Sequence, residues 1–494
     1  MSYARRVAYN TIVQMIGRLV TSGVSLVTVT LLNSGFQPER WGIYVALTTY
    51  INLFATIADL GISTVYLREL SQHPDDAEAV SKKYLGFRFV TAAVLLGSAP
   101  LISLLVPVYH QYSEFISILA VGQFFLILNQ LFVSFVQARL LMGWASLSDL
   151  CGRLLVMTGT FFVFRDVPQP HQLFAVTLTV VGGSILNMLI TFLVVGRMVP
   201  LRLEFRWREW PALLRQVAPL SALVVLSLIH FKADSFILAL VKPPVDVGIY
   251  GNAYKIIEIY LLLPGIFVGS VFPALTQAGS TDPKRLMGLF QKAFDLIIMS
   301  VVPLVLFTVL LAPYIIGVLT RYNIAQSAYA LQILAFSIGV WFVIYLVENT
   351  LIALYRQVSV SLVEGAAAVF NIALNLWAIP RYSYVGAAYT TFISELAAGI
   401  CVCFLLYRVM RYLPSLFAVG SAAVGAFIVG IFCWAVRAHS TQWLTTYLGW
   451  HRLTEVLFLL LALSILSLVY VIPLWVLGLL PPVLKERLPA GLSR

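Results

Sequence analysis

The feature that most constrains this chain is a series of apolar segments, each long enough to cross a lipid bilayer as a helix. A transmembrane helix needs about 20 predominantly apolar residues. No segment between two spans is long enough to hold a folded domain, so any function must lie inside the helical bundle or at its rims. We predict fourteen spans, at 11–32, 42–63, 84–107, 115–137, 147–164, 172–196, 217–241, 248–275, 289–311, 327–351, 358–379, 384–407, 415–436 and 455–480.

The composition supports an all-α polytopic membrane protein. Of the 494 residues, 60% are hydrophobic and 11% are charged, whereas a soluble domain has about 25% charged residues. The net charge of +11 does not indicate nucleic-acid binding, because the basic residues are scattered between the spans. Their bias to one side predicts that both termini are cytoplasmic. The four cysteines do not have metal-ligand spacing, so we expect no metal site.

Two pairs of short motifs indicate an internal duplication. The triplet Gly-Ile-Tyr opens the second span at Gly42 and the eighth at Gly248, and the pattern Ser-x-Ser-x-x-x-Gly begins near the fifth span at Ser146 and the eleventh at Ser359. Both pairs are six spans apart, so the two halves would have the same orientation. We therefore predict two six-helix lobes related by a pseudo-twofold axis along the membrane normal, an arrangement in which transporters place a site between the halves.

The duplication predicts four regions. Residues 1–197 form the first lobe with spans one to six, 198–216 a cytoplasmic connector, 217–410 the second lobe with spans seven to twelve, and 411–494 the last two spans and a cytoplasmic tail. In the connector, arginines alternate with aromatic and aliphatic residues, which indicates that it lies on anionic headgroups of membrane lipids.

Basic side chains inside the spans are the first group of candidate site residues. Charged groups in a bilayer usually face the bundle interior or a wet cavity, and the planar fork of arginine suits phosphate oxygens. The alternatives are snorkelling toward the interface, especially for Arg88, and a local Lys255–Glu258 pair along one helix. The candidates for binding an anionic headgroup are Arg18, Arg88, Arg153, Lys232 and Lys255.

Uncharged polar and acidic side chains form the second group. The polar ones either line a cavity or form hydrogen bonds between helices, and the acids either carry a proton or cation or pair with the basic residues. The polar candidates are Gln14, Asn52, Gln123, Gln130, Asn371, Asn375 and Tyr254, and the acidic candidates are Asp59, Asp234, Glu258, Glu364 and Glu395.

Three segments carry a family resemblance. The stretch "KADSFILALVKPPVDVGIYGNAYKIIEIYLLLPGIFVGSVFPALTQ" (232–277) resembles the start of the second lobe in Wzx-type polysaccharide flippases of the multidrug/oligosaccharidyl-lipid/polysaccharide (MOP) exporter superfamily. The stretch "WGIYVALTTYINLFATIADLGISTVYLREL" (41–70) resembles the first-lobe counterpart. The third, "FNIALNLWAIPRYSYVGAAYTTFISEL" (370–396), resembles the family's Asn-rich helix, although Arg381-Tyr382-Ser383 replaces a shorter Gly-containing turn.

The resemblance implies a flippase rather than an enzyme. Such a protein sits in the bacterial cytoplasmic (inner) membrane and moves a polyprenyl-pyrophosphate-linked oligosaccharide from the cytoplasmic to the outer leaflet by alternating access. Cationic cavity residues hold the pyrophosphate, and Arg18 matches the position class of such a residue. The resemblance implies no catalytic residue and no cofactor, with coupling to H⁺, Na⁺ or the membrane potential. A monomer in contact with other polysaccharide-assembly membrane proteins is expected.

Two other functions fit a chain of this class. A MATE-like multidrug or cation exporter has the same fold, but it would favour acids over arginines in its cavity. A membrane-embedded polysaccharide polymerase would ordinarily need a long outer loop or a catalytic domain, and no segment between the predicted spans is that long.

Overall fold

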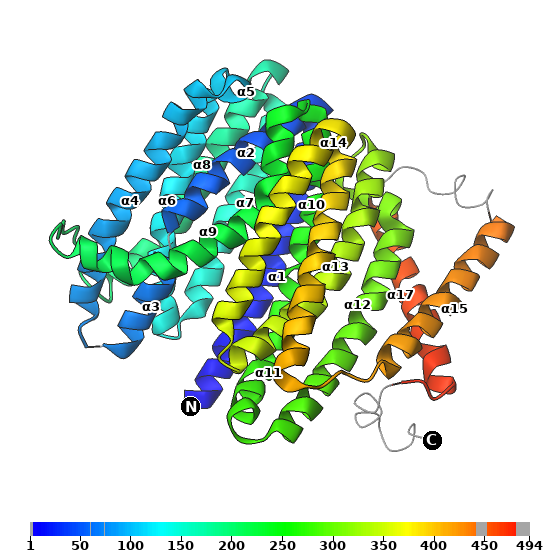
Figure 1. Ribbon diagram of the computed structural model, residues 1–494. Coiled ribbons are helices and arrows are strands. Elements are labelled where there is room, and N and C mark those ends of the chain that lie inside the picture. Colours follow the sequence, from blue (N-terminus) through cyan, green and yellow to red (C-terminus); the bar gives the residue numbers. More distant parts are fainter. Residues whose placement is uncertain (1–2, 60, 74, 441–451, 481–494) are drawn as a thin grey trace. The chain divides into compact units, whose positions relative to one another are not determined.

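The computed structural model describes residues 3–59, 61–73, 75–440 and 452–480, which form helices and their connections and contain no strand (Figure 1). The predicted all-α fold is confirmed. By its internal contacts the chain divides into two compact units, Met1–Gly248 and Ile249–Arg494.

The first unit is built mainly from long apolar helices. Its helices α6 and α7 both pack on α8, while α1 packs on α7, α4 on α6, and α2 on α9. The helices are α1 (Tyr3–Gly35), α2 (Pro38–Asp59), α3 (Ile62–Gln72), α4 (Ala77–Leu105), α5 (Pro107–His110), α6 (Ser113–Ala138), α7 (Met142–Asp166), the 3₁₀ helix η1 (Gln169–His171), α8 (Gln172–Gly196), α9 (Trp210–Val241) and the start of α10 (Pro244–Tyr260).

The second unit is arranged around α13. This helix packs against α11, α12 and α14, and α12, α15 and α17 pack on one another. Its helices, besides the rest of α10, are α11 (Leu262–Thr281), α12 (Pro283–Leu319), α13 (Ile324–Ala353), α14 (Gln357–Met410), α15 (Phe417–Ser440) and α17 (Arg452–Val476).

The structure bears on the predicted number of spans. Twelve helices in the described part of the chain are long and apolar enough to cross a membrane. One of them, α14, covers the eleventh and twelfth predicted spans, and its backbone is non-helical at Ser383, where φ is 53°. The seventh predicted span corresponds to α9, which is 32 residues long but is not among the twelve. The total of fourteen and the orientation of the termini stay predictions.

The unit boundary differs from the boundary suggested by the repeat. Helix α9 belongs to the first unit because it packs on α2, whereas the repeat would begin a second lobe at residue 217. The unit boundary reflects contacts in space, whereas the repeat reflects similarity between two parts of the sequence. The two predicted lobes therefore stay a prediction.

The glycines of the two Gly-Ile-Tyr triplets, Gly42 and Gly248, lie at a close helix contact inside the first unit. The Trp41 Nε1–H donates to the Gly248 carbonyl oxygen at 3.3 Å. A Cβ atom on Gly42 would lie 1.6 Å from the Pro244 oxygen. Only glycine permits so close an approach of two backbones, so the repeated triplet has a packing role at the start of α2 and α10.

Candidate functional site

A polar cavity of about 200 Å³ lies between α1, α6, α7 and α8 in the first unit. Polar side chains are costly inside a bilayer and usually face the bundle interior or a wet cavity, so a cavity with many of them is a candidate binding site. Its polar lining consists of Gln14, Arg18, Thr21, Asn129, Ser146, Asp149 and Asn187.

Arg18 is the basic group of this cavity. Gln14, Arg18 and Thr21 are spaced by four and three residues, which places them on one face of α1. The Arg18 side chain is exposed, and its guanidinium has no hydrogen bond or ion pair with the described residues. It therefore presents its donors to the cavity without an anionic partner among the described residues.

Arg153 is the second arginine near this cavity, and it is already paired. Its Nε lies 3.0 Å from a carboxylate oxygen of Asp149, one turn earlier on α7. Its Nη1 also donates to the Ser25 hydroxyl on α1. The one acid that lines the cavity is thus neutralised by its neighbour on the same helix.

The inner wall of the cavity contains two asparagines that were not among the sequence candidates. The Asn129 Nδ2 donates to Asn187 Oδ1 at 3.0 Å, and Thr191 donates to Asn129 Oδ1. Both asparagines are buried. Each is an amide inside a predicted span, so a complete survey of in-span amides would have identified them.

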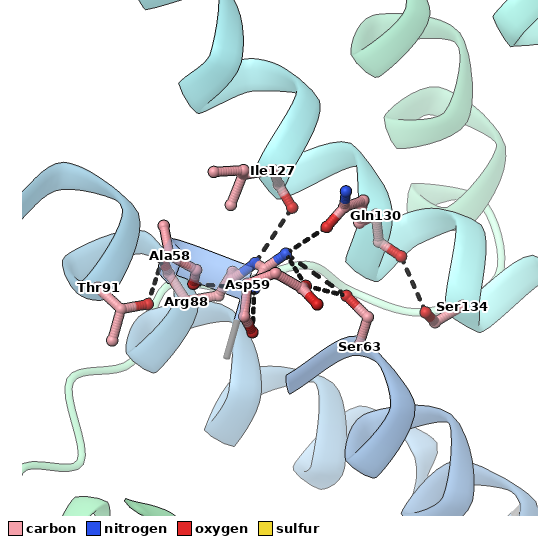
Figure 2. A network of polar contacts seen from close by, with 8 residues as sticks. All are labelled: Ala58, Asp59, Ser63, Arg88, Thr91, Ile127, Gln130 and Ser134. Carbon is pink, nitrogen blue, oxygen red and sulfur yellow. Dashed lines mark hydrogen bonds and ion pairs between the residues drawn. The ribbon is translucent and has the colours of Figure 1, made fainter. Parts of the chain in front are cut away.

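Figure 2 shows a second polar cluster in the same unit, centred on Arg88 of α4. The Arg88 side chain is 0% exposed. Its Nη2 donates to Asp59 Oδ1 at 2.6 Å and to Gln130 Oε1 at 2.6 Å. The structure thus brings together three residues that the sequence had proposed separately for headgroup binding, coupling and sugar binding.

The Arg88 guanidinium also holds the end of α2. Its Nη1 donates to the Ala58 and Asp59 carbonyl oxygens at 3.2 and 2.8 Å, and its Nε to the Ile127 oxygen at 3.2 Å. The last carbonyls of a helix lack helical donors, and a cation at that end is also favoured by the helix dipole. Gly61, with φ of 66°, then redirects the chain into α3.

All three nitrogens of Arg88 are occupied by protein acceptors, so this arginine presents no free donor to a ligand. Asp59 is correspondingly held by Arg88 and by the Ser63 hydroxyl, which donates to it at 2.9 Å. Its side chain keeps 22% exposure, and Gln130 is exposed. The cluster is closed around the guanidinium and open only at its edge.

Other polar candidates of the first unit lie outside these two clusters. Gln123 Nε2 donates to Asn52 Oδ1 at 2.9 Å, linking α6 to α2 at an exposed position. Asp234 on α9 is 2% exposed and accepts from the Ser235 amide at 2.6 Å. Lys232 is half-buried two residues earlier on the same helix.

In the second unit, the asparagine candidates join the two parts of α14. Asn371 Nδ2 donates to the Ser394 hydroxyl at 2.8 Å, and Asn375 Nδ2 donates to Asn371 Oδ1 at 2.7 Å. Thr390 donates to Asn375 Oδ1. Because both asparagines are buried, these bonds fix one part of the helix against the other.

Two groups of charged candidates are also found in the second unit. The local ion pair predicted from sequence is confirmed, since Lys255 Nζ lies 2.8 Å from Glu258 Oε2. A second group contains Glu348 on α13 with Glu364 and Glu395 on α14, which packs against α13. The Glu348 Oε1 atom is buried without a hydrogen-bond partner among the described residues, and Glu395 is buried.

The last polar candidate from the sequence lies on α10. Tyr254 is buried on α10, with its ring 5.8 Å from that of Tyr250. Within the described residues, no group of three or more His, Cys, Asp or Glu side chains could hold a metal ion.

Comparison with known proteins places the chain in a family. The profile of the family described as polysaccharide biosynthesis protein matches residues 7–279, which is more than half of the chain. A curated relative, the "probable flippase AglR" of Haloferax volcanii, is 24% identical over 434 residues, covering 81% of this chain and 83% of that protein.

Solved structures share the fold at low identity. The lipid II flippase MurJ, in an inward closed conformation, matches with a TM-score of 0.73 at 15% identity, over 94% of this chain and 99% of that one. An inward-facing multidrug resistance MATE family transporter of the MOP superfamily matches with a TM-score of 0.63 at 13% identity, over 81% and 98%. The chain therefore belongs to the polysaccharide biosynthesis protein family, and it shares its fold with these two transporters.

Proposed function

We propose that this protein is a flippase-type membrane transporter of the MOP superfamily, and that it moves a polyprenyl-pyrophosphate-linked oligosaccharide from the cytoplasmic to the outer leaflet by alternating access, for cell-surface polysaccharide biosynthesis in the bacterial inner membrane. The observation that carries the proposal is the Arg18 guanidinium, which lines a polar cavity and has no anionic partner among the described residues. A guanidinium can bind two phosphate oxygens at once through parallel N–H donors. The family's description and the flippase relative support the same class of cargo.

Arg18 is the primary pyrophosphate ligand in this proposal. Arg153 contributes second, because an arriving pyrophosphate competes with the Asp149 carboxylate for its guanidinium. Lys232 and Lys255 contribute at a later stage of transport. Arg88 is a positioning residue, because its donors are all used to hold α2, α3 and α6 in place.

Sugar hydroxyl groups need both donors and acceptors, which amide side chains supply. Gln14 lines the Arg18 cavity, and Asn52, Gln123 and Gln130 have exposed or half-buried amides in the same unit. We assign the saccharide to these groups. Asn371 and Asn375 are already hydrogen-bonded within α14, so we give them a structural role.

The acids of the second unit are the proposed coupling groups. Glu348 of α13 and Glu364 and Glu395 of α14 are acids within predicted spans on two helices that pack together, and acids inside a bundle are typical of proton relays. Gain and loss of a proton by one of them would couple transport to an H⁺ gradient. No cofactor takes part, and the monomer carries the complete transport path.

The charge of the Arg18 cavity argues against a cationic drug as cargo. A cation exporter needs an available carboxylate, and the lining acid of this cavity, Asp149, is paired with Arg153. The unpaired charge is positive and favours an anion.

The experiment is complementation of a strain in which the chromosomal copy of this gene is deleted. We expect polyprenyl-pyrophosphate-linked saccharide to accumulate, and plasmid-borne wild type and Arg165→Gln to clear it. Arg18→Gln should fail although the protein is present in the membrane in equal amount. If no lipid-linked saccharide accumulates, the proposed cargo is wrong. If Arg18→Gln clears it as wild type does, the cargo stands and the proposed site is wrong.

A further inference from the structure

The segment between α8 and the first turns of α9 is strongly basic. Residues 197–215, here termed the basic connector, contain five arginines and two glutamates, a net charge of +3. Nothing in the transport proposal uses these charges. The contacts of the segment show which of the arginines are neutralised by the protein and which are available.

The basic connector follows a fixed path over α4. A Cβ atom on Gly86 would lie 2.0 Å from the Glu204 carbonyl oxygen, so the two backbones are in direct contact. The Glu204 carboxylate pairs with Arg206 at 2.8 Å and with Lys82 at 3.2 Å. Hydrogen bonds from Arg206 and Lys82 hold the pKa of this carboxyl below its ordinary value. Arg206 therefore serves to fasten the segment rather than to bind a ligand.

The aromatic side chains of the basic connector pack against α4 or against each other, yet they remain largely exposed. Phe205 and Trp207 are stacked, with ring centroids 5.8 Å apart, and Phe205 also contacts Phe89 of α4 at 6.4 Å. Nevertheless Phe205 is 45% exposed and Trp207 is 60% exposed. Exposed aromatic rings that a neighbouring helix holds in place are typical of a membrane–water interface.

Two arginines alternate with these rings and have no counterion among the described residues. Arg202 and Arg208 are exposed, and neither forms a hydrogen bond or ion pair with the residues that the structure describes. An unpaired guanidinium beside an interfacial tryptophan suits a phosphate group at the depth of lipid headgroups.

We propose that the basic connector is a binding surface for anionic phospholipid headgroups, with Arg202 and Arg208 contacting the phosphates and Phe205 and Trp207 inserted between the lipids. Its backbone is held against α4 before any lipid arrives, so little ordering is needed on binding. The proposal does not depend on the identity of the transported molecule, because none of these four residues lines the Arg18 cavity.

Lipid retention by the full-length protein tests the two arginines. Protein in nanodiscs that contain equal amounts of phosphatidylglycerol and phosphatidylcholine is released in a mass spectrometer, and the bound lipids are counted. We expect wild type to retain phosphatidylglycerol preferentially, and Arg202→Gln or Arg208→Gln each to weaken that binding about fivefold, as expected for one basic residue at an anionic surface. Arg165→Gln, an exposed arginine at the end of α7, is the matched control and should behave as wild type.

Quenching of Trp207 fluorescence tests the position of the aromatic rings. Brominated phosphatidylglycerol should quench the tryptophan fluorescence of wild type more than that of Trp207→Phe. This difference in quenching should be smaller when the bromines are on phosphatidylcholine. Equal retention of phosphatidylglycerol by wild type and both connector variants would overturn the proposal. It would also be overturned if Arg165→Gln lost as much phosphatidylglycerol binding as the two connector variants. Equal quenching of the Trp207 fluorescence by the two brominated lipids would overturn it as well.

Discussion

Arg88 and Arg18 lie in the same unit, and their surroundings are opposite. Arg88 is fully buried, and each of its nitrogens donates to an acceptor of the protein. Arg18 is exposed at a polar cavity and has no partner among the described residues. A buried charge must be compensated by the fold, whereas a charge at a cavity can be compensated by cargo. We therefore expect the first arginine to stabilise the protein and the second to bind a ligand.

The largest effect that separates the two arginines should be on stability. Arg88→Met leaves the carbonyls at the end of α2 and the Asp59 carboxylate without their donor, so we expect unfolding to become easier by about 3–5 kcal/mol. Thermal unfolding in detergent measures this change. If Arg88→Met had the melting temperature of wild type, Arg88 would not have the structural role assigned to it.

A smaller loss of stability is expected when Asp59, the acidic partner of Arg88, is replaced. Asp59→Asn keeps an oxygen acceptor for the Arg88 Nη2 but removes the negative charge, and it should cost about 1.5–3 kcal/mol, as for a hydrogen bond to a charged group. The same unfolding measurement applies. The double variant Arg88→Met/Asp59→Asn should lose less than the sum of the single losses. Strict additivity would show that the two side chains are not coupled.

The Asp149–Arg153 pair should have the smallest effect on stability. It is a half-exposed pair one turn apart on α7, and such pairs contribute about 0.3–0.5 kcal/mol. We expect Arg153→Gln to unfold nearly as wild type does and to weaken transport only partly. A loss of stability similar to that of Arg88→Met would show that Arg153 also belongs to the protein's own framework.

Local sequence patterns predicted much of the fold. The long apolar segments predicted helices, and α8 runs over residues 172–196 as expected. The Lys255–Glu258 pair was also predicted, because residues three apart on a helix are neighbours. The separate spans before and after residues 380–383 correspond to the non-helical backbone at Ser383.

The sequence could not distinguish the two arginines. Arg88 lies near the beginning of its span, which is typical of a snorkelling residue, but it is fully buried by partners that are 29 and 42 positions away. Such a network depends on how α2, α4 and α6 pack against one another. The helical periodicity of each segment does not predict that packing. The same holds for Asn129 and Asn187, whose partnership joins two helices 58 residues apart in the chain.

The most direct test compares binding of a short-chain polyprenyl pyrophosphate to purified wild type and to Arg18→Gln by calorimetry, with unfolding measured on the same samples. Loss of one charged hydrogen-bonding group is worth about 1.5–3 kcal/mol. We therefore predict that Arg18→Gln binds roughly 10- to 100-fold more weakly while its melting temperature is unchanged. Equal affinity of the two proteins, at equal stability, would contradict the assignment of Arg18 as the residue that holds the pyrophosphate.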